Sequence, residues 1–456
     1  MRSPGPARLT PIDLASVRPS AVPAYRRDIT PSIVHLGVGG FARAHLGTYA
    51  DELLFAGHSA AIHGISLRSD RAESQLVPQG CLYTVNEREL NQSSGPQVVG
   101  AFTQVSTGVD AAVRAITRPE TRLVTLTVTE KGYVADPEHR ESTPAMVIAR
   151  ALGRRDPTTS PPVIAPLDNV SSNGRVLRHN VLEAAATFDH DLARWIAESV
   201  SFADSVVDRI VPATTPADLA EITNQLGLVD RAAVICEHHR SWVIAGYGGE
   251  LPLDEVGVEI VTDAAPYERR KLWLLNGPHS ALAYVGLLTG CESIAAAVGR
   301  TEVRTFVERY IDDVLEVIDL PPGLDPSGFA SSAMARFANP ALGHRCLQVG
   351  TDGSTKLPQR IAPVATARIA AGLPTRRLAM IVAIWLAALC GLEVPGALLP
   401  RPDDRITTEL DDIDPRRRIY AGLRSLDLGN SSFAAEILSA LDELLDVGPL
   451  VIGAIR

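Results

Sequence analysis

The sequence has few cysteines, few aromatic residues and no excess of positive charge. Its 456 residues include five cysteines that stand far apart in the chain: Cys81, Cys236, Cys291, Cys346 and Cys390. No two of them are close enough to form the paired ligands of a zinc site, so we predict no metal site. Scattered cysteines of this kind are typical of reduced, mostly buried thiols in a cytoplasmic protein.

The chain also lacks a long hydrophobic run. The most apolar stretch, Leu378 to Leu392, has about 15 residues, fewer than the ~20 that a membrane-spanning helix needs. We interpret it as a buried core helix. The first thirty residues contain no apolar segment typical of a secretory signal. The formal net charge of −10 argues against nucleic acid or an anionic membrane as the main partner, so we expect a small-molecule substrate.

The character of the sequence changes near residue 265. Before it, short β-branched runs alternate with helical segments, and one run, Val234 to Ile244, is predicted as a strand that contains His238 and His239. After it, Ala- and Leu-rich helical segments continue to the end, interrupted by a predicted polar loop at 350–360. We therefore predict an α/β N-terminal Rossmann-type dinucleotide-binding domain with an N-terminal extension at 1–265, and a mostly α-helical C-terminal substrate and catalytic domain at 266–456.

A glycine pattern follows the first predicted strand. After the apolar run Ile33 to Leu36 come Gly37, Gly39 and Ala42, at the spacing of a G-x-G-x-x-A turn, and a helix is predicted from Ala44 to Phe55. In a dinucleotide-binding turn the first glycine permits the tight bend, and the second lets the backbone approach the pyrophosphate. The alternative is a plain turn, but the order of strand, glycine turn and helix favours nucleotide binding.

An acidic residue follows the second predicted strand, Ala61 to Leu67. Asp70 stands where a carboxylate binds the ribose hydroxyls of NAD, and a carboxylate there would repel the 2′-phosphate of NADP. The sequence thus predicts NAD over NADP, although Arg68 and Arg71 flank this position. The alternative is that Asp70 only caps the next helix.

Two further polar residues come at the ends of predicted strands. The alternating run that begins at Arg122 leads to Glu130, and the run that begins at Val163 leads to Asp168 and Asn169. Ligands of open α/β sheets bind at the carboxyl ends of the strands, so both positions are candidates for the site. The alternatives are a solvated strand end for Glu130 and an Asx-type turn for Asn169.

The segment from Tyr267 to His279 combines three polar residues with an otherwise apolar run. On an α-helix Lys271, Asn276 and His279 would lie at roughly 0°, 140° and 80°, on one side of the helix. We expect Pro278 to kink the helix beside them and to direct Asn276 and His279 toward Lys271. The alternative is that Asn276, Gly277 and Pro278 simply end one helix and begin another.

Together these motifs resemble the polyol-specific long-chain dehydrogenases, a family that includes mannitol 2-dehydrogenase and the fructuronate and tagaturonate reductases. The resemblance covers nearly the whole chain from about residue 31. It rests on the glycine turn through His45, on Thr129 to Tyr133, on Asp168 and Asn169 with Asn173 and Gly174, and on Lys271-x4-Asn276-x2-His279.

The resemblance implies hydride transfer between NAD and a secondary alcohol or ketone, without zinc, in a protein that is a monomer. It implies Lys271 as the acid/base, Asn276 and Asn169 as the oxyanion hole, and His279 as a residue that places the substrate. Glu130 and Glu268 match acidic positions associated with proton relay. The predicted cofactor-binding residues are Gly37, Gly39, Gly40, Phe41, Arg43 and Asp70.

The substrate stays open at this point. Candidates are mannitol and fructose, another polyol and its ketose, a hexuronate such as fructuronate, or mannitol 1-phosphate. An anionic substrate would need an extra cation, which Lys356, Arg360 or Arg240 would supply. Two other classes of protein also fit parts of the sequence. One is a nucleotide-binding regulatory protein without catalysis, and the other is a sugar isomerase or epimerase that uses resident NAD.

Overall fold

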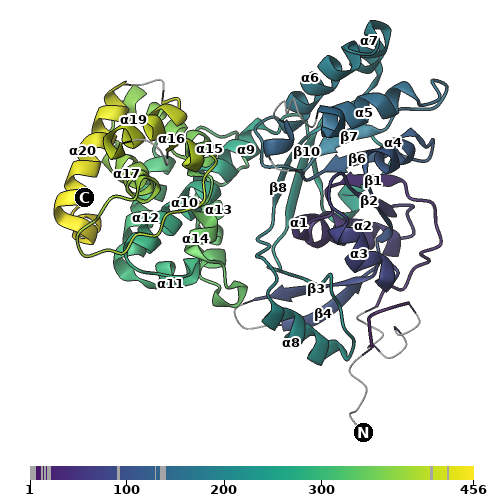
Figure 1. The fold of residues 1–456 in the computed structure, drawn as a ribbon, viewed down its shortest axis with the longest axis horizontal. Coiled ribbons are helices and arrows are strands. Elements are labelled where there is room, and N and C mark those ends of the chain that lie inside the picture. The colour runs from purple at the N-terminus through teal and green to yellow at the C-terminus, as the bar shows by residue number, and fades with distance from the viewer. Residues whose placement is uncertain are drawn as a thin grey trace. The chain divides into compact units, whose positions relative to one another are not determined.

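The computed structural model describes residues 7–11, 14, 17, 22–89, 93–128, 130–133, 140–410, 414–428 and 431–455. The chain forms two compact units, Met1–Ala265 and Pro266–Arg456 (Figure 1). The first unit combines strands with helices, and the second is helical.

A five-stranded parallel sheet lies at the centre of the first unit, in the order β5-β2-β1-β6-β7. The β-branched and apolar residues of these segments suit a sheet that is buried on both faces. The predicted fold class, a Rossmann-type domain followed by a helical domain, is therefore confirmed. The strands are β1 (Ile33–Leu36), β2 (Ile62–Ser66), β5 (Phe102–Thr107), β6 (Leu123–Leu126) and β7 (Val163–Pro166).

Helices cover both faces of this sheet. Successive strand residues point to opposite faces, so Val34 and Leu36 join one hydrophobic core while Ile33 joins the other. The core around Val34 contains α4 (Val109–Thr117), α5 (Pro144–Gly153), α6 (Asn173–Ala186) and α7 (His190–Ser199), whereas that around Ile33 contains α2 (Leu46–Phe55). Figure 1 shows α4 to α7 gathered at one end of the unit.

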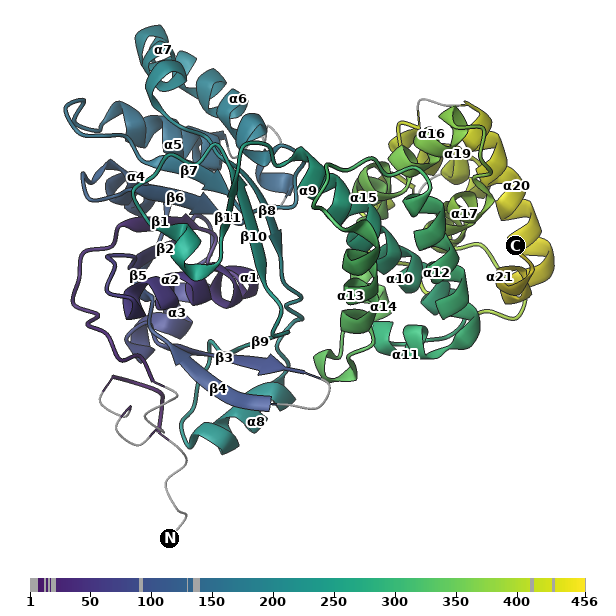
Figure 2. The ribbon, with the colours of Figure 1, turned by 180° about the vertical axis from the view of Figure 1, so that it is seen from behind.

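Two small sheets complete the first unit. One has the order β11-β10-β8, and the other has the order β4-β3-β9 with α8 (Pro216–Leu226) beside it (Figure 2). The helix α3 (Arg71–Leu76) follows β2. The strands are β3 (Tyr83–Arg88), β4 (Ser93–Val99), β8 (Asp204–Asp208), β9 (Val234–Cys236), β10 (Ser241–Ala245) and β11 (Glu259–Val261).

The predicted single strand from Val234 to Ile244 is wrong. The segment divides into β9 and β10, which belong to different sheets, and His238 and His239 lie in the connection between them. Glu237 explains the break. Its carboxylate accepts the backbone N–H of Ile210 at 2.6 Å, and its carbonyl accepts Arg209 Nε at 3.0 Å. Because the Glu237 carbonyl is bonded to Arg209, it is not paired with a neighbouring strand, and the strand is interrupted there.

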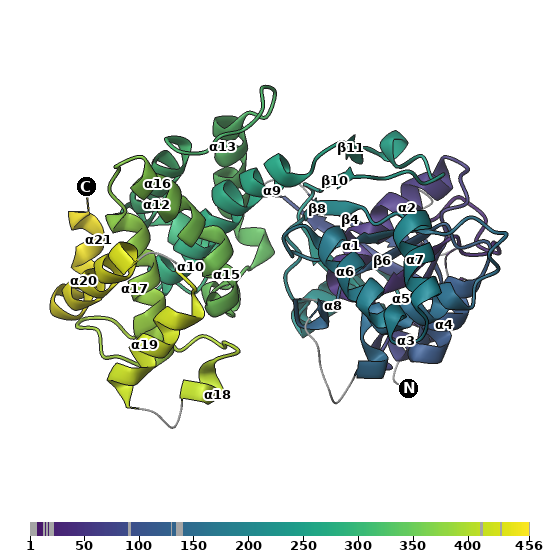
Figure 3. The same cartoon turned by 90° about the horizontal axis from the view of Figure 1, so that it is seen from above.

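The second unit is built around α10 (Gly277–Leu288), which contacts α11, α12, α14 and α17; Figure 3 shows α10 among the helices of this unit. The predicted core helix at 378–392 is confirmed as α17 (Arg376–Cys390), which is buried along almost its whole length. The other helices of the unit are α9 (Ala265–Lys271), α11 (Ile294–Gly299), α12 (Thr301–Leu315), α13 (Pro326–Phe337), α14 (Cys346–Val349), α15 (Gly353–Arg360), α16 (Ala362–Ala370), α18 (Thr407–Leu410), α19 (Pro415–Ser425), α20 (Ser431–Val447) and α21 (Val451–Ala454).

The predicted polar loop at 350–360 is also wrong, because most of it is the helix α15. Asp404 makes this possible: its carboxylate accepts the backbone N–H of Ser354 at 2.9 Å and also the Ser354 hydroxyl. A partner far away in the sequence thus satisfies the helix start, and Leu357 is buried on the inner side. In the part of the chain that the structure describes, every helix is too short or too polar to span a lipid bilayer.

Candidate functional site

Polar side chains of β1 and of the segment after β6 hold the glycine turn of the first unit through the Gly37 carbonyl. Gly37 has a φ of +102°, and a Cβ there would clash with the carbonyl of Thr127. The Gly37 carbonyl accepts the hydroxyl of Thr127 at 2.7 Å, and Nε2 of the buried His35 lies 3.0 Å from it. Only glycine fits this position. A Cβ on Gly39, by contrast, would meet nothing within 4 Å, so the turn leaves its backbone open, as a dinucleotide requires.

Three more predicted cofactor residues belong to the short helix α1 (Gly40–Ala44), which directly follows this turn. The ring of Phe41 is stacked on His45, with 4.9 Å between the ring centroids, and Arg43 Nη1 donates to the carbonyl of Val38 at 3.2 Å. Gly40, Phe41 and Arg43 are all half-buried. The contacts of Phe41 and Arg43 lie within the turn and the helices that follow it. Contact of the three residues with a cofactor stays a prediction.

Asp70 lies beyond β2 and immediately before α3. Its side chain is exposed and makes no capping hydrogen bond to α3. Ser69 accepts the backbone N–H of Arg71 instead, at 3.2 Å. Asp70 therefore occupies the N-cap position of α3 but its side chain does not cap the helix, and it stays the candidate for the ribose hydroxyls.

The predicted strand that leads to Glu130 is shorter than expected. β6 ends at Leu126, and Glu130 begins a 3₁₀ turn, Glu130–Tyr133, so the prediction of a strand end at Glu130 is wrong. The side chain of Glu130 lies outside the described residues. The strand ends because the backbone N–H of Val128 donates to a side chain, Asp168 Oδ1, at 2.8 Å.

Asp168 joins the carboxyl ends of β6 and β7. Its other carboxylate oxygen accepts the Tyr133 hydroxyl at 2.9 Å, and its carbonyl accepts Asn173 Nδ2 at 2.9 Å. Asn169 follows it and is exposed. Asp168 and Tyr133 thus fix the backbone on either side of Glu130 and Asn169. Asp168 and Tyr133 appear in the sequence analysis only as parts of motifs. No local pattern in the sequence predicts their pairing, because 35 residues separate them.

The second unit holds the other four predicted catalytic residues. Lys271 ends α9 and is 8% exposed, and Asn276, 6% exposed, ends a π-helical turn, Leu272–Asn276. In that turn the N–H of Gly277 donates to the carbonyl of Leu272, five residues back. Residues five apart therefore lie on one face, which brings Lys271 and Asn276 to the same side. Glu268 lies in the first turn of α9 and is half-buried.

His279 lies in the first turn of α10 between two other rings. Its Nε2 is buried and has no hydrogen-bond partner among the described residues. Burial, and then the positive charges of Arg360, Lys356 and Arg336 and the nearby His344, hold the pKa of His279 well below its usual value. The ring is therefore neutral at neutral pH, and Nε2 can donate or accept a hydrogen bond according to its tautomer.

Two of the three cations proposed for an anionic substrate lie near His279. Arg360 Nη1 donates to the hydroxyl of Ser280, the residue after His279, at 3.0 Å. Lys356 Nζ donates to the carbonyl of Val349 at 3.2 Å. Both belong to α15, the helix that the sequence analysis mistook for a loop.

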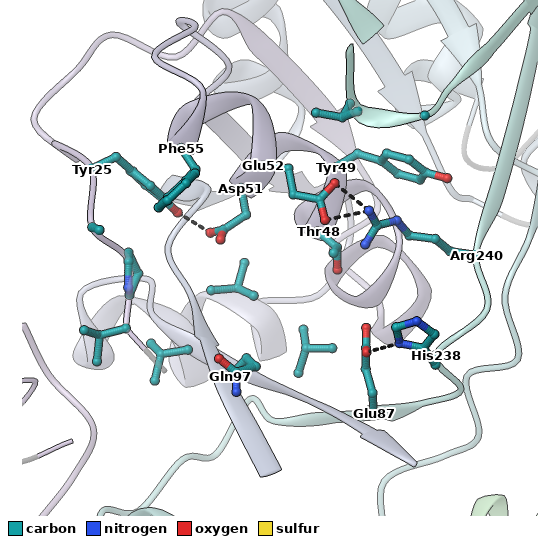
Figure 4. Close-up of a pocket in the computed structure, with 18 of the residues that line it drawn as sticks. Tyr25, Thr48, Tyr49, Asp51, Glu52, Phe55, Glu87, Gln97, His238 and Arg240 are labelled. Atoms are coloured by element: carbon teal, nitrogen blue, oxygen red, sulfur yellow. Dashed lines mark hydrogen bonds and ion pairs between the residues drawn. The ribbon is translucent and has the colours of Figure 1, made fainter. Parts of the chain in front are cut away.

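The third cation, Arg240, is paired with an acidic side chain of the first unit. It donates to the carboxylate of Glu52 and lies over the ring of Tyr49, 4.7 Å from its centroid. Arg240 lines a cavity of about 700 Å³ within the first unit, where Figure 4 shows it directed at Glu52. Tyr25 donates to Asp51 and His238 contacts Glu87 in the same cavity. These polar groups satisfy one another, so the structure gives no support to Arg240 as a substrate ligand.

The structure also addresses metal binding. Among the described residues no cluster of three or more histidine, cysteine or acidic side chains is arranged to hold a metal ion.

Comparison with known proteins adds the family. Residues 31–254 match the mannitol dehydrogenase Rossmann domain, and residues 263–423 match the mannitol dehydrogenase C-terminal domain. The chain is 34% identical to D-mannonate oxidoreductase of Escherichia coli, over 91% of this chain and 93% of that protein. It is 32% identical to mannitol 2-dehydrogenase of Cereibacter sphaeroides, over 91% and 95% of the two chains.

Solved structures of polyol dehydrogenases also match this fold. The ternary complex of Pseudomonas fluorescens mannitol 2-dehydrogenase with NAD and D-mannitol matches with a TM-score of 0.87 at 28% identity, over 98% of this chain and 99% of that chain. A D-sorbitol dehydrogenase in substrate-free form matches with a TM-score of 0.82 at 27% identity, over 98% of this chain and 100% of that chain. The predicted resemblance is thus confirmed, and the chain belongs to the mannitol dehydrogenase family of oxidoreductases.

Proposed function

We propose that this protein is an NAD-dependent, zinc-independent oxidoreductase that interconverts a polyol and its ketose, such as mannitol and fructose. The observation that carries the proposal is the buried Lys271, which shares one face of a π-helical turn with the buried Asn276 in a chain of this family. A lysine and an amide placed together in this way provide a proton acceptor beside a hydrogen-bond donor, the two groups that alcohol oxidation needs.

The cofactor would be held by the first unit. Gly37 and Gly39 would face the pyrophosphate, Gly40, Phe41 and Arg43 would complete the turn, and Asp70 would bind the ribose hydroxyls. When bound, NAD accepts the hydride from the alcohol carbon.

The residues of the chain would move the proton and stabilise the charge. In oxidation, Lys271 takes the hydroxyl proton, and Asn276 donates through its Nδ2 to the alkoxide as it forms. In reduction, Lys271 returns the proton to the ketone oxygen. Asn169 would act as a second oxyanion donor, Glu130 and Glu268 as proton-relay residues, and His279 as the residue that binds a substrate hydroxyl through Nε2.

The experiment that tests this function is a screen of polyols, ketoses and hexuronates that follows NADH, run with NAD and NADP side by side. We expect turnover of a polyol and ketose pair with NAD. Binding of NAD without turnover of any compound would instead indicate a regulatory protein. NAD that stays bound through purification, with no net NADH formation, would indicate an isomerase or epimerase.

Asp70 provides the test of the coenzyme. Replacing it by serine removes the carboxylate that would repel a 2′-phosphate, and Arg68 and Arg71 stay beside it. We expect the ratio of kcat/KM with NAD to kcat/KM with NADP to fall by about tenfold or more in Asp70→Ser. An unchanged ratio would contradict the assigned role of Asp70.

A hexuronate is the second candidate substrate, and mannitol 1-phosphate is a related anionic one. A specific observation favours an anion: Arg336, Lys356 and Arg360 are the charged groups that depress the pKa of His279. Among the relatives, the D-mannonate oxidoreductase carries a carboxylate substrate in its name. If the substrate is an anion, Lys356→Gln will lower kcat/KM for fructuronate far more than for fructose.

We propose that the protein works in the cytoplasm, which its free cysteines favour, and that it is a monomer, as the family resemblance implies. Its described cysteines are free thiols, and four of the five are buried: Cys81, Cys236, Cys346 and Cys390. A single peak of monomer mass by size-exclusion chromatography with light scattering is expected, and a stable dimer would contradict it.

A further inference from the structure

The imidazole ring of His279 is held between two other rings. The ring of Phe337 is stacked on it with 4.6 Å between centroids and 15° between planes. The ring of His344 meets it edge-on at 4.9 Å and 65°. A parallel ring on one side and an edge-on ring on another restrict rotation of the imidazole about its own side-chain bonds.

Both rings come from outside the helix that carries His279, and the backbone holds each in place. Phe337 is the last residue of α13, a helix that packs against the π-helical turn, and it is 3% exposed. The carbonyl of His344 accepts the N–H of Ile294 at 2.9 Å, and the next residue, Arg345, forms an antiparallel bridge with Ser293. The two rings therefore do not depend on His279 for their own positions.

Burial, and then the groups near His279, lower the pKa of the ring and keep it neutral. These groups are His344, Arg360, Lys356 and Arg336, and all of them disfavour a positive charge on His279. Burial, with the charge of Lys356, lowers the pKa of His344 itself to about 4. Because both histidines are neutral, the stacked arrangement persists through the physiological pH range, and the buried Nε2 of His279 stays without a partner among the described residues.

We propose that Phe337 and His344 are positioning residues that hold the ring of His279 so that Nε2 faces the substrate. The proposal rests on the proposed function, in which His279 binds a substrate hydroxyl. A ring free to turn would present Nε2 for only part of the time. A small misplacement of a group that orients the substrate costs catalysis heavily, up to about a hundredfold for 1 Å.

The first test compares variants of the two rings. Phe337→Leu and His344→Leu should lower kcat/KM for the polyol by about tenfold or more, mainly through KM, with the dissociation constant for NAD unchanged. Phe337→Tyr and His344→Phe, which keep an aromatic ring, should recover most of the activity. Phe433→Leu is the matched control, because Phe433 is 2% exposed in α20 of the same unit and should lower only the thermal stability.

The second test does not require turnover. In NMR spectra of the full chain with ¹⁵N-labelled histidine, the His279 ring should show one neutral tautomer, with no protonation near neutral pH. In Phe337→Leu it should show exchange between tautomers. If Phe337→Leu and His344→Leu match the wild type in kinetics and spectra, the positioning role is refuted. If the wild type turns over no polyol, the proposed function fails, and the spectra still decide the positioning role.

Discussion

The backbone N–H of Gly277 donates to the carbonyl oxygen of Leu272, five residues earlier in the chain. An α-helical donor would bind four residues back, so this turn holds one extra residue. On an α-helix Lys271 and Asn276 would lie on the same side but about 140° apart, and the widened turn brings them closer together around the helix axis. The helix distortion that we expected at Pro278 thus lies in the turn before it. Pro278 itself stands in the first turn of α10, where a backbone N–H is not needed.

Gly277→Ala should distort this turn. A Cβ at Gly277 would clash with the hydroxyl of Tyr310, which donates to the carbonyl of Arg360 at 3.2 Å. We expect a loss of about 1–3 kcal/mol in the free energy of unfolding and a lower kcat, measured by urea denaturation and steady-state kinetics. Gly299→Ala is the control, because a Cβ there meets nothing within 4 Å. Equal effects of the two substitutions would contradict the prediction.

Lys271→Ala should remove most of the activity and leave NAD binding intact. Removal of a general acid/base costs typically about 10²–10⁴-fold in rate, and Lys271 lies in the second unit while the dinucleotide turn lies in the first. The measurements are kcat for the polyol and NAD affinity by calorimetry. Arg269→Ala replaces an exposed cation two residues earlier and should retain activity. A fully active Lys271→Ala protein would refute the acid/base role.

Gly37→Ala should abolish nucleotide binding, for two separate reasons. Alanine is strained at a φ of +102°, and its Cβ would also clash with the Thr127 carbonyl. Gly57→Ala is the control for strain outside the turn, because Gly57 has a φ of +94° but open space around a Cβ. We expect Gly57→Ala to lose only about 1 kcal/mol of stability and to bind NAD normally. Similar NAD affinities for the two variants would contradict the role of Gly37 in the dinucleotide turn.

His63 should make the fold less stable in acid. Burial, with the charge of Arg118, lowers the pKa of His63 from 6.5 to about 4. Between these values the unfolded chain binds more protons than the folded one, so stability falls as pH decreases from about 6.5 toward 4. Each unit of the pKa difference is worth about 1.4 kcal/mol.

His63→Gln should therefore flatten the dependence of the unfolding free energy on pH across this window, measured by urea denaturation at a series of pH values. His179→Gln is the control, because His179 has a side chain that is 71% exposed. The prediction fails if the slope of His63→Gln equals that of the wild type.

Local sequence pattern and structure differ most clearly where strands end. The alternating residues from Arg122 onward predict a strand, and the sequence has no feature that stops it before Glu130. The strand stops at Leu126 because Asp168 takes the N–H of Val128. In the same way Glu237 interrupts the run at 234–244, and Asp404 allows a helix at Gly353–Arg360. In each case a carboxylate that binds a backbone N–H distant in sequence overrides the local pattern.

The sequence by itself determined the order of β1, the glycine turn and the following helices, the helical character after residue 265, and the family motifs. These depend on local periodicity, on turn-forming residues and on spacing, which neighbouring residues decide. Only the tertiary structure decided that the turn between Lys271 and Gly277 is π-helical, that Phe337 and His344 enclose His279, and that Arg240 pairs with Glu52. Those relationships depend on backbone widening and on contacts between segments far apart in the chain, which no local pattern encodes.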